Sequence, residues 1–594
     1  MLPRVVSLLA LLTCLTYVTA DIGCLKGSFT EIDNEFTVEP VETVTCKTGF
    51  CQSAYYNDGQ DITYVLDCAP DGVTAEGCKD DFGKSTKTCY CKTDLCTHVD
   101  AGSPVEFSLK DITMSSATAA YQVEGATDID GRGPSIWDLY QKRPGVIRHN
   151  DTADVGCDSY HLWKDDVKLL SDMGVDQYRF SISWTRILTD GTVATNNSLG
   201  IAYYHKLIDA LIAEKIEPVV TMYHWDLPQG LMDQGGWLNQ NTAKVFGEYA
   251  AFLLEEYGDK VKKWIPINEP VSVSQFEYCG DTHSDAPGNF IPHCAWSMYL
   301  AAANMIRGHT EAWKAYKALN ETNPDKYADM TFGIALSGPW YYAGDDKNET
   351  QKGASIRSFE FYWGLYAHPL IKGGWSDFLI EQIGNLSIAE GRKISRLPVF
   401  SDEEIKDMTG SVQFLGVNYY NSLMARSLEA ELPANRWAHT QEDYDAAATG
   451  DWLPAWRSIN ASNGWIVYTP SGLRLLLNHI KEQYDNIPVL ITENGCMDTC
   501  DEGRQDNTRI HYLRGHLIAI SQAKHVDGVN VIGYTLWSLM DNFEWLDGFT
   551  TKFGIHEVDF NSPNRTRTPK ASAGFFKNAI AKRSVEGFLI NSRY

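Results

Sequence analysis

The segment Asn486–Gly495 reads Asn-Ile-Pro-Val-Leu-Ile-Thr-Glu-Asn-Gly and indicates the fold of most of this chain. Its apolar, largely β-branched run lacks alternation, which is typical of a strand buried on both faces in a parallel sheet. The run stops at Glu493, and in α/β barrels the residue at such a strand end faces the active-site mouth. The pattern recurs at Val261–Pro270, which presents Glu269. Each glutamate alone could be a solvated strand-end residue, but we expect the two to work as a pair.

Further segments of the same kind alternate with helical ones toward the C-terminus. Apolar residues recur at helical spacing in 201–216 and 506–526. Eight strand–helix units predict a (β/α)8 TIM barrel over residues 107–585, with long active-site loops at 279–293 and 424–466. The predicted strands are 111–117, 176–183, 218–224, 262–268, 331–337, 413–418, 487–493 and 530–537.

The composition fits a folded protein with a large core. The chain has 594 residues, which a barrel with insertions can accommodate, and 44% of them are hydrophobic and 12% aromatic. The formal net charge of −26 argues against a nucleic-acid-binding protein, because a phosphate backbone requires a surplus of Lys and Arg.

The N-terminus resembles a cleaved secretory signal. Residues 1–20 contain Arg4, an apolar run through Leu15 and the small-residue ending Val18-Thr19-Ala20. No later stretch of about 18 apolar residues follows, so we expect a secreted or luminal protein without a transmembrane segment. Residues 586–594 form a short tail of mixed character. Seven sequons fit this route, although such tripeptides also arise by chance: Asn150, Asn196, Asn320, Asn348, Asn385, Asn460 and Asn564.

Eight of the 14 cysteines lie between Cys24 and Cys96, which predicts a small disulfide-rich β domain over residues 21–100. A zinc site is the weaker alternative, since CxxC pairs and His ligands are missing. The ending from Cys89 to Thr97 resembles that of three-finger domains of the Ly6/uPAR type, although Tyr90 separates two cysteines and Thr97 replaces the usual Asn. The resemblance implies a non-catalytic module that binds a protein partner.

A linker over residues 101–106 follows this module. Among the remaining cysteines, Cys279–Cys294 and Cys496–Cys500 could each close a loop, which would leave Cys157 unpaired and buried.

Polar and acidic groups stand at the same end of successive predicted strands, which core packing does not explain. The motifs around them resemble those of glycoside hydrolase family 1, which includes β-glucosidases, lactase-phlorizin hydrolase and the klotho proteins. These motifs are Asn-Glu-Pro (268–270), Thr-Glu-Asn-Gly (492–495), Tyr-Arg-Phe-Ser-Ile-Ser-Trp (178–184), Tyr-His-Trp-Asp-Leu-Pro (223–228) and Asp-Asn-Phe-Glu-Trp (541–545). The resemblance covers nearly the whole predicted barrel.

The resemblance implies a retaining β-glycosidase that needs no metal or organic cofactor. Glu493 would be the nucleophile and Glu269 the acid/base, with carboxyl groups roughly 5–5.5 Å apart, against roughly 6.5–9.5 Å in inverting enzymes. Glu493 should be charged and Glu269 protonated until the bond breaks. Arg179 and Tyr420 would bind Glu493 and favour its ionised form.

The remaining site residues would bind the substrate. By resemblance, Gln122, His224, Asn268 and Glu544 would hold the sugar hydroxyls. Apolar faces would come from Trp225, Trp537, Trp545 and Phe553, and Trp465 would flank the leaving group. A lone His is more often structural, and Trp537 or Trp545 could instead belong to the core.

One position departs from the family pattern. Members usually have Thr two residues before the Asn-Glu pair, and this chain has Pro266. Proline removes a backbone donor and is normally confined to edges, bulges or first positions of a strand. We therefore expect a local irregularity below Glu269 that shifts the acid/base and lowers activity.

The preferred substrate is a small β-glycoside with a terminal glucose, galactose or fucose. Glu544-Trp545 favours a plain sugar over a 6-phosphorylated one. A thioglucosidase or a transglycosidase would share the first chemical step. A klotho-like binding protein is the alternative from another class, although binding-only relatives often lose one or both glutamates and this chain keeps both.

Overall fold

The structure, a computed structural model, describes residues 105–587 apart from 281–284, 289, 429–442 and 450–457, together with six strands upstream of residue 92. It divides into two compact units, Met1–Pro104 with Trp452–Arg457, and Val105–Asp451 with Ser458–Tyr594. The predicted signal at 1–20, the linker residues 101–104 and the tail residues 588–594 lie outside the described residues.

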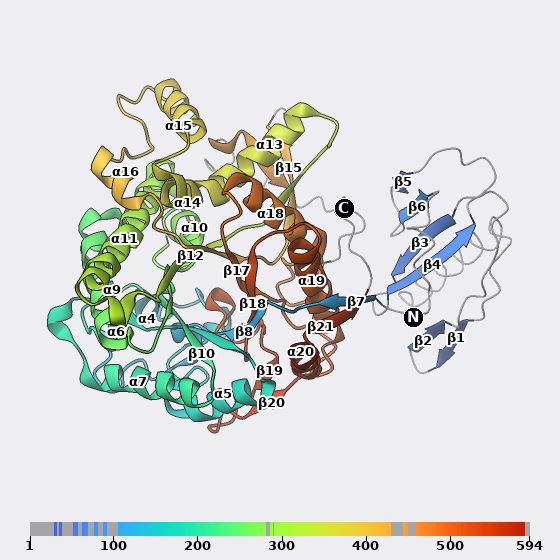
Figure 1. The fold of residues 1–594 in the computed structure, drawn as a ribbon, viewed down its shortest axis with the longest axis horizontal. Helices are drawn as coiled ribbons and strands as arrows, with labels where there is room; N and C mark the ends of the chain where they lie inside the picture. Colours follow the sequence, from blue (N-terminus) through green and yellow to red (C-terminus); the bar gives the residue numbers. More distant parts are fainter. Residues whose placement is uncertain are drawn as a thin grey trace. The chain divides into compact units, whose positions relative to one another are not determined.

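Eight parallel strands of the larger unit close into a barrel in the order β10-β11-β12-β14-β17-β18-β8-β9 (Figure 1). The predicted TIM barrel is therefore confirmed, and each predicted strand is present near its expected bounds. The strands are β8 (Thr113–Ala117), β9 (Gln177–Ser181), β10 (Glu217–Tyr223), β11 (Lys263–Ile267), β12 (Thr331–Ser337), β14 (Phe414–Asn418), β17 (Val489–Asn494) and β18 (Val531–Trp537).

Helices surround the barrel on its outside (Figure 1). The two helices predicted from periodicity are α7 (Ser198–Ala213) and α19 (Asn507–His525). In α7, Tyr204 and Ile208 are fully buried, as expected for the side that packs on the sheet. The other longer helices are α5 (Ser159–Met173), α9 (Gln240–Tyr257), α11 (Cys294–Thr322), α13 (Glu349–Phe359), α15 (Asp377–Ala389), α18 (Pro470–Gln483) and α20 (Ala571–Lys582).

The interior of the barrel is packed with side chains. Val219, Ile265, Ala335, Phe414 and Leu490 form a buried apolar cluster that takes one residue from each of five consecutive strands. Such layers fill the interior of a closed barrel. Polar side chains near the carboxyl ends of the strands therefore lie above a packed apolar layer.

The segment 424–466, expected to be an irregular loop, contains regular structure, so that expectation is wrong in part. β15 (Ser422–Ser427) pairs in parallel with β13 (Trp340–Ala343) and antiparallel with β16 (Ala446–Thr449). β13 follows β12 in the chain, and β15 follows β14. Pairing between them satisfies the hydrogen bonds of backbone N–H and C=O groups that would otherwise lack partners. The remaining small pairs are β7 (Val105–Ser108) with β21 (Ser584–Gly587) and β19 (His556–Val558) with β20 (Arg567–Pro569).

In the smaller unit the backbone of six strands is described. β1 (Phe29–Ile32) pairs with β2 (Glu35–Val38), and a four-stranded antiparallel sheet has the order β4-β3-β6-β5. These last strands are β3 (Cys51–Asn57), β4 (Ile62–Cys68), β5 (Gly77–Asp80) and β6 (Lys87–Cys91). The cysteine side chains lie outside the described residues, so the disulfide framework and the three-finger resemblance stay predictions.

The cysteines of the barrel unit follow the sequence expectation in two of three cases. Cys279 and Cys294 form a disulfide, and Cys157 is an unpaired, buried thiol. The expected Cys496–Cys500 bond is wrong, because both are free thiols, with Cys496 buried and Cys500 exposed. Within the described residues, no helix combines the length and apolar character needed to cross a bilayer.

A substitution at Gly495 tests the close contact between the segment after β17 and the end of β18. A Cβ atom at this position would lie 1.8 Å from the carbonyl oxygen of Trp537, so the backbones would have to separate. We expect Gly495→Ala to lower the free energy of unfolding by about 1–3 kcal/mol or more, measured by urea denaturation.

The matched control is Gly574→Ala, in α20, where an added Cβ would meet no atom within 4 Å. It should raise stability by up to about 1 kcal/mol, because alanine favours a helix over glycine. An unchanged urea midpoint for Gly495→Ala would contradict the tight contact.

Candidate active site

Glu493 lies near the carboxyl end of β17 with its side chain almost fully buried. Its Oε1 accepts a hydrogen bond from Nη1 of Arg179 at 2.8 Å, and its Oε2 accepts one from the hydroxyl of Tyr420 at 2.7 Å. Arg179 comes from β9 and Tyr420 follows β14, so three different strands build this contact. The structure thus brings together the predicted nucleophile, Glu493, and the two residues that were expected to bind it.

Glu269 follows β11 and precedes the short helix α10 (Pro270–Ser272), where its backbone has a φ of 47°. Its Oε1 accepts a hydrogen bond from Nδ2 of Asn418 at 2.7 Å, and its Oε2 accepts one from the hydroxyl of Ser272 at 2.7 Å. Its backbone N–H donates to the carbonyl oxygen of Ala335 on β12. The carboxyl group is therefore buried and fixed at both oxygens.

A hydrogen-bonded chain connects the two carboxylates through Asn268. Nη2 of Arg179 donates to Oδ1 of Asn268 at 2.6 Å, and Nδ2 of Asn418 lies 3.2 Å from the same oxygen. Since Arg179 also binds Glu493 and Asn418 also binds Glu269, the chain runs without a break from one carboxylate to the other. The two acidic groups belong to one site.

The pKa values of both carboxyl groups are raised, and burial is the main cause. The pKa of Glu493 rises to about 7, because burial and the nearby Glu269 outweigh the lowering effect of Arg179 and Tyr420. Arg179 and Tyr420 therefore act in the expected direction, since each favours the ionised form of Glu493, while burial raises the net pKa. The direct contact with Arg179 favours the negative charge on Glu493.

Pro266 coincides with the irregularity that the sequence predicted. β11 and β12 pair at Trp264–Phe332 and again at Asn268–Ala335, so β11 has one more residue than β12 between these pairs. This bulge places the proline, which has no N–H, where the ladder is interrupted. Glu269 above it keeps its side-chain partners.

The polar groups expected to bind a sugar lie beside the carboxylates. Nε2 of Gln122, on α3 (Ala120–Val123), lies 3.2 Å from Oε2 of Glu544, and its own Oε1 is buried without a hydrogen-bond partner among the described residues. Nε2 of His224 lies 3.2 Å from Nδ2 of Asn268. Burial and Arg179 hold the pKa of His224 far below its usual value, so the ring is neutral. Unpartnered buried groups of this kind are available to a ligand.

Aromatic rings line the same region. His224 stacks on Trp537 with ring centres 5.8 Å apart, and Trp545 packs against Trp225 at 4.8 Å. Trp537, Trp545 and Trp225 are each less than 9% exposed, so they also contribute to the core. Trp545 gains further contacts from Tyr121 and Trp137.

Trp465 and Phe553 both meet the ring of Tyr420 edge-on, at 5.6 and 5.9 Å. Phe553 is buried, whereas Trp465 is 43% exposed. Trp465 is therefore the more solvent-accessible of the two rings that contact Tyr420.

Three residues of this network were not predicted as site residues: Asn418, Ser272 and Asn542. Asn418 ends a predicted strand, as Asn268 also does, so its position carried a usable signal. Asn542 accepts a hydrogen bond from Gln122 at 3.0 Å, and Ser272 lies one helical turn after Glu269. Within the described ranges, no group of three or more His, Cys, Asp and Glu side chains is arranged to hold a metal ion.

Comparison with known proteins agrees with this arrangement. The sequence model of glycosyl hydrolase family 1 matches residues 106–585. Human cytosolic beta-glucosidase is 37% identical over 80% of this chain and 98% of its own length. Human lactase/phlorizin hydrolase is 38% identical over 78% of this chain, which spans only 24% of that longer protein.

The structure of aphid myrosinase superposes with a TM-score of 0.73 at 36% identity, covering 81% of this chain and all of that one. The family motifs, the closed barrel and the paired buried carboxylates agree with one another. The chain belongs to glycosyl hydrolase family 1 and is a β-glucosidase-like glycoside hydrolase.

Proposed function

We propose that this protein is a secreted, retaining β-glycosidase that removes a terminal β-linked glucose, galactose or fucose from oligosaccharides or small aglycones. The observation that carries the proposal is the continuous network from Glu493 through Arg179, Asn268 and Asn418 to Glu269. This network supports the proposal that the two carboxyl groups, which have different hydrogen-bond partners, act together on one glycosidic bond.

In the first step, a carboxylate oxygen of Glu493 forms a bond to the anomeric carbon as the glycosidic bond breaks. The proton of Glu269 moves to the leaving oxygen, so the aglycone departs as a neutral alcohol. In the second step, Glu269 takes a proton from water, whose oxygen attacks the anomeric carbon and releases Glu493. Both steps leave the enzyme in its starting protonation state.

The partners of each carboxyl group suit these roles. Arg179 gives Glu493 a cationic neighbour that stabilises the ionised nucleophile. Glu269 has no cation in direct contact among the described residues and accepts hydrogen bonds from neutral side chains, including those of Asn418 and Ser272. Burial therefore favours its protonated form, as an acid catalyst requires.

The glycone would be held by Gln122, neutral His224, Asn268 and Glu544 against the rings of Trp537 and Trp545. Burial and the neighbouring Asp547 raise the pKa of Glu544 well above its usual value. A carboxyl group in that state can donate to or accept from a sugar hydroxyl. The aglycone would meet Trp465.

The rival functions differ in what supports them. A klotho-like receptor is favoured by Pro266 and by the cysteine-rich module, whereas the presence of both glutamates with their partners favours an enzyme. Thioglucoside hydrolysis or transglycosylation remains compatible with the same first step, and one similar structure is that of a myrosinase. A substrate panel separates these variants.

The proposal of a secreted protein implies that exposed sequon asparagines carry N-glycans. The asparagines of six sequons are exposed: Asn150, Asn196, Asn348, Asn385, Asn460 and Asn564. Asn320 differs, because it is half-buried and its Oδ1 is buried without a hydrogen-bond partner among the described residues. The cysteine-rich module would bind a protein partner that localises the enzyme.

The chemistry is tested by release of nitrophenol from β-glucoside, β-galactoside, β-fucoside and thioglucoside substrates. Glu493→Gln should lower kcat by a factor on the order of 10³ or more, because an amide is a poor nucleophile. Glu349→Gln, which alters an exposed glutamate on α13, is the control and should match the parent. Near-parental turnover by Glu493→Gln would contradict the assigned nucleophile.

The pH dependence tests the role of Arg179. Since Glu493 must be ionised to attack, kcat/KM falls as the pH drops through its pKa. Arg179 lowers that pKa, so Arg179→Met should move this acidic limb to higher pH by about one unit or more. Tyr420→Phe should shift the limb in the same direction, by less.

Arg307→Met, which removes a half-buried arginine paired with Glu404, controls for general loss of charge. Its acidic limb should coincide with that of the parent. A limb that stays in place in both Arg179→Met and Tyr420→Phe would show that another group controls it.

Mass spectrometry of the secreted protein tests the predicted modification. Enzymatic removal of N-glycans should convert asparagine to aspartate at the exposed sequons and leave Asn320 unchanged, since its side chain is partly buried at the end of α11. A secreted protein without any N-glycan would overturn the proposed glycosylation.

A further inference from the structure

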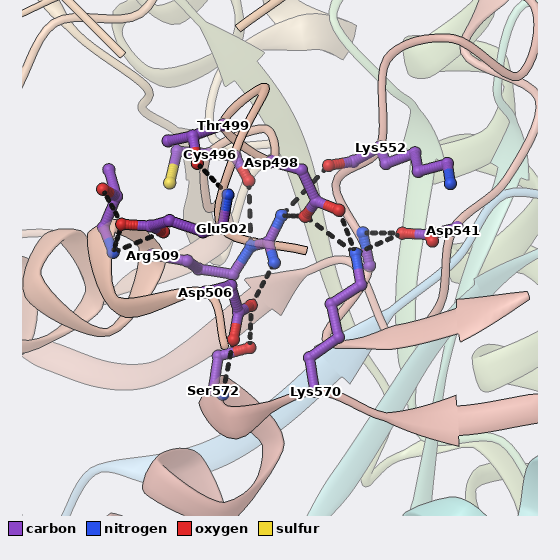
Figure 2. A network of polar contacts seen from close by, with 12 residues as sticks. Cys496, Asp498, Thr499, Glu502, Asp506, Arg509, Asp541, Lys552, Lys570 and Ser572 are labelled. Carbon is purple, nitrogen blue, oxygen red and sulfur yellow. Dashed lines mark hydrogen bonds and ion pairs between the residues drawn. The ribbon is translucent and has the colours of Figure 1, made fainter. Parts of the chain in front are cut away.

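A network of charged side chains that the mechanism above does not use connects the segments after β17 and β18 (Figure 2). Asp498 follows β17, Asp541 follows β18, and Lys570 immediately precedes α20. Nζ of Lys570 donates to both carboxylate oxygens of Asp498 at 2.7 Å and to Oδ1 of Asp541 at 2.8 Å. Arg509, in the first turn of α19, forms ion pairs with Asp498 and Asp506.

The side chains of Lys570 and Arg509 are each 1% exposed, and that of Asp541 is 0% exposed. Removing charges from water carries a large desolvation penalty, and well-packed apolar side chains often stabilise a core equally well. Overall stability is therefore a weak reason for such a network. A better explanation is that the network holds the segments it connects in one particular geometry.

The network fixes both ends of the segment 541–554. At its start, Oδ1 of Asp541 binds Lys570 and also accepts from the backbone N–H of Gly554 at 3.1 Å. Near its end, the carbonyl oxygen of Lys552 accepts from the backbone N–H of Asp498 at 2.8 Å and from Nη2 of Arg509 at 3.0 Å. The segment is thus closed into a loop whose base rests on four charged residues.

This loop, which we call the glycone loop (residues 541–554), carries side chains assigned above to the sugar: Glu544, Trp545 and Phe553. Its Asn542 accepts a hydrogen bond from Gln122 at 3.0 Å. The network also reaches the nucleophile strand, because Nε of Arg509 donates to the carbonyl oxygen of Cys496 at 3.1 Å, three residues after Glu493. One set of charges therefore holds the sugar-binding loop and the segment that follows the nucleophile.

We propose that Lys570 is a positioning residue for the reaction: through Asp541 and Asp498 it fixes the glycone loop relative to Glu493 and thereby sets glycone selectivity. The inference rests on the proposed glycosidase function. Lys570 is the connecting member, since it alone contacts the aspartates that follow both β17 and β18 in the described network. Without its charge, the carboxylate of Asp498 would face the fully buried carboxylate of Asp541, and the base of the loop would separate.

The test compares Lys570→Met with Arg567→Met. Methionine retains most of the length of either side chain and removes its charge. Arg567 is a matched control, because it is a buried cation on β20 paired with the buried Asp166 instead of with the glycone loop. Both variants should lose thermal stability. Only Lys570→Met should raise KM for the nitrophenyl β-glucoside, by about tenfold, a loss like that of a tuned supporting contact.

Selectivity provides a readout that general destabilisation would not change. The β-glucoside and β-galactoside differ only in the orientation of one hydroxyl group, so the ratio of their kcat/KM values reports how well the glycone is held. This ratio should move toward 1 in Lys570→Met and stay at the parental value in Arg567→Met. Equal ratios in the parent and both variants would overturn the inference.

If Lys570→Met does not fold, Asp498→Asn replaces it, because this change leaves Lys570 paired with Asp541 and weakens one side of the network. It should shift the same ratio in the same direction, and an unchanged ratio would equally overturn the inference. A parent protein that hydrolyses none of the glycosides would instead refute the proposed function, so the two failures are distinguishable.

Discussion

The buried guanidinium of Arg179 is the interaction on which the active site depends. It donates to the hydroxyl of Thr221 on β10 and to Oδ1 of Asn268 after β11. On β17 it donates to the carbonyl oxygen of Thr492 and to Oε1 of Glu493. A buried cation must be fully paired, because an unpaired one is strongly destabilising. That requirement fixes the ends of strands far apart in sequence against one another, which brings Glu493 and Glu269 into one network.

The same burial that makes Arg179 an effective anchor raises the pKa values of the carboxyl groups around it. Glu493, Glu269 and Glu544 are all shifted upward, so the site holds fewer negative charges near neutral pH than its three carboxyl groups suggest. The neighbours then decide which group keeps its charge: a guanidinium beside Glu493, and an amide and a hydroxyl beside Glu269. A difference in partners, at similar burial, supports different chemical roles for two identical side chains.

Charged groups outside the reacting centre organise the loops that surround it. Lys570 and Arg509 join segments that follow β17 and β18, while Asp547 accepts from Asn463 and so connects the glycone loop to the segment that carries Trp465. The bulge at Pro266 interrupts the pairing of β11 with β12 locally. Glu269 nevertheless keeps its hydrogen bond from Asn418. The barrel supplies the frame, and these contacts set where its loops lie.

The sequence by itself determined the eight strands, their closure into a barrel, the family and the residues that meet at the strand ends, because apolar runs and strand-end motifs are local patterns. It also located the irregularity at Pro266, since proline acts on its own backbone. Only the tertiary structure decided the net pKa of Glu493, the roles of Asn418 and Ser272 as partners of Glu269, the free state of Cys496 and Cys500, and the pairing of β15 with β13 and β16. These features depend on burial and on distances between segments far apart in the chain, which no local pattern encodes.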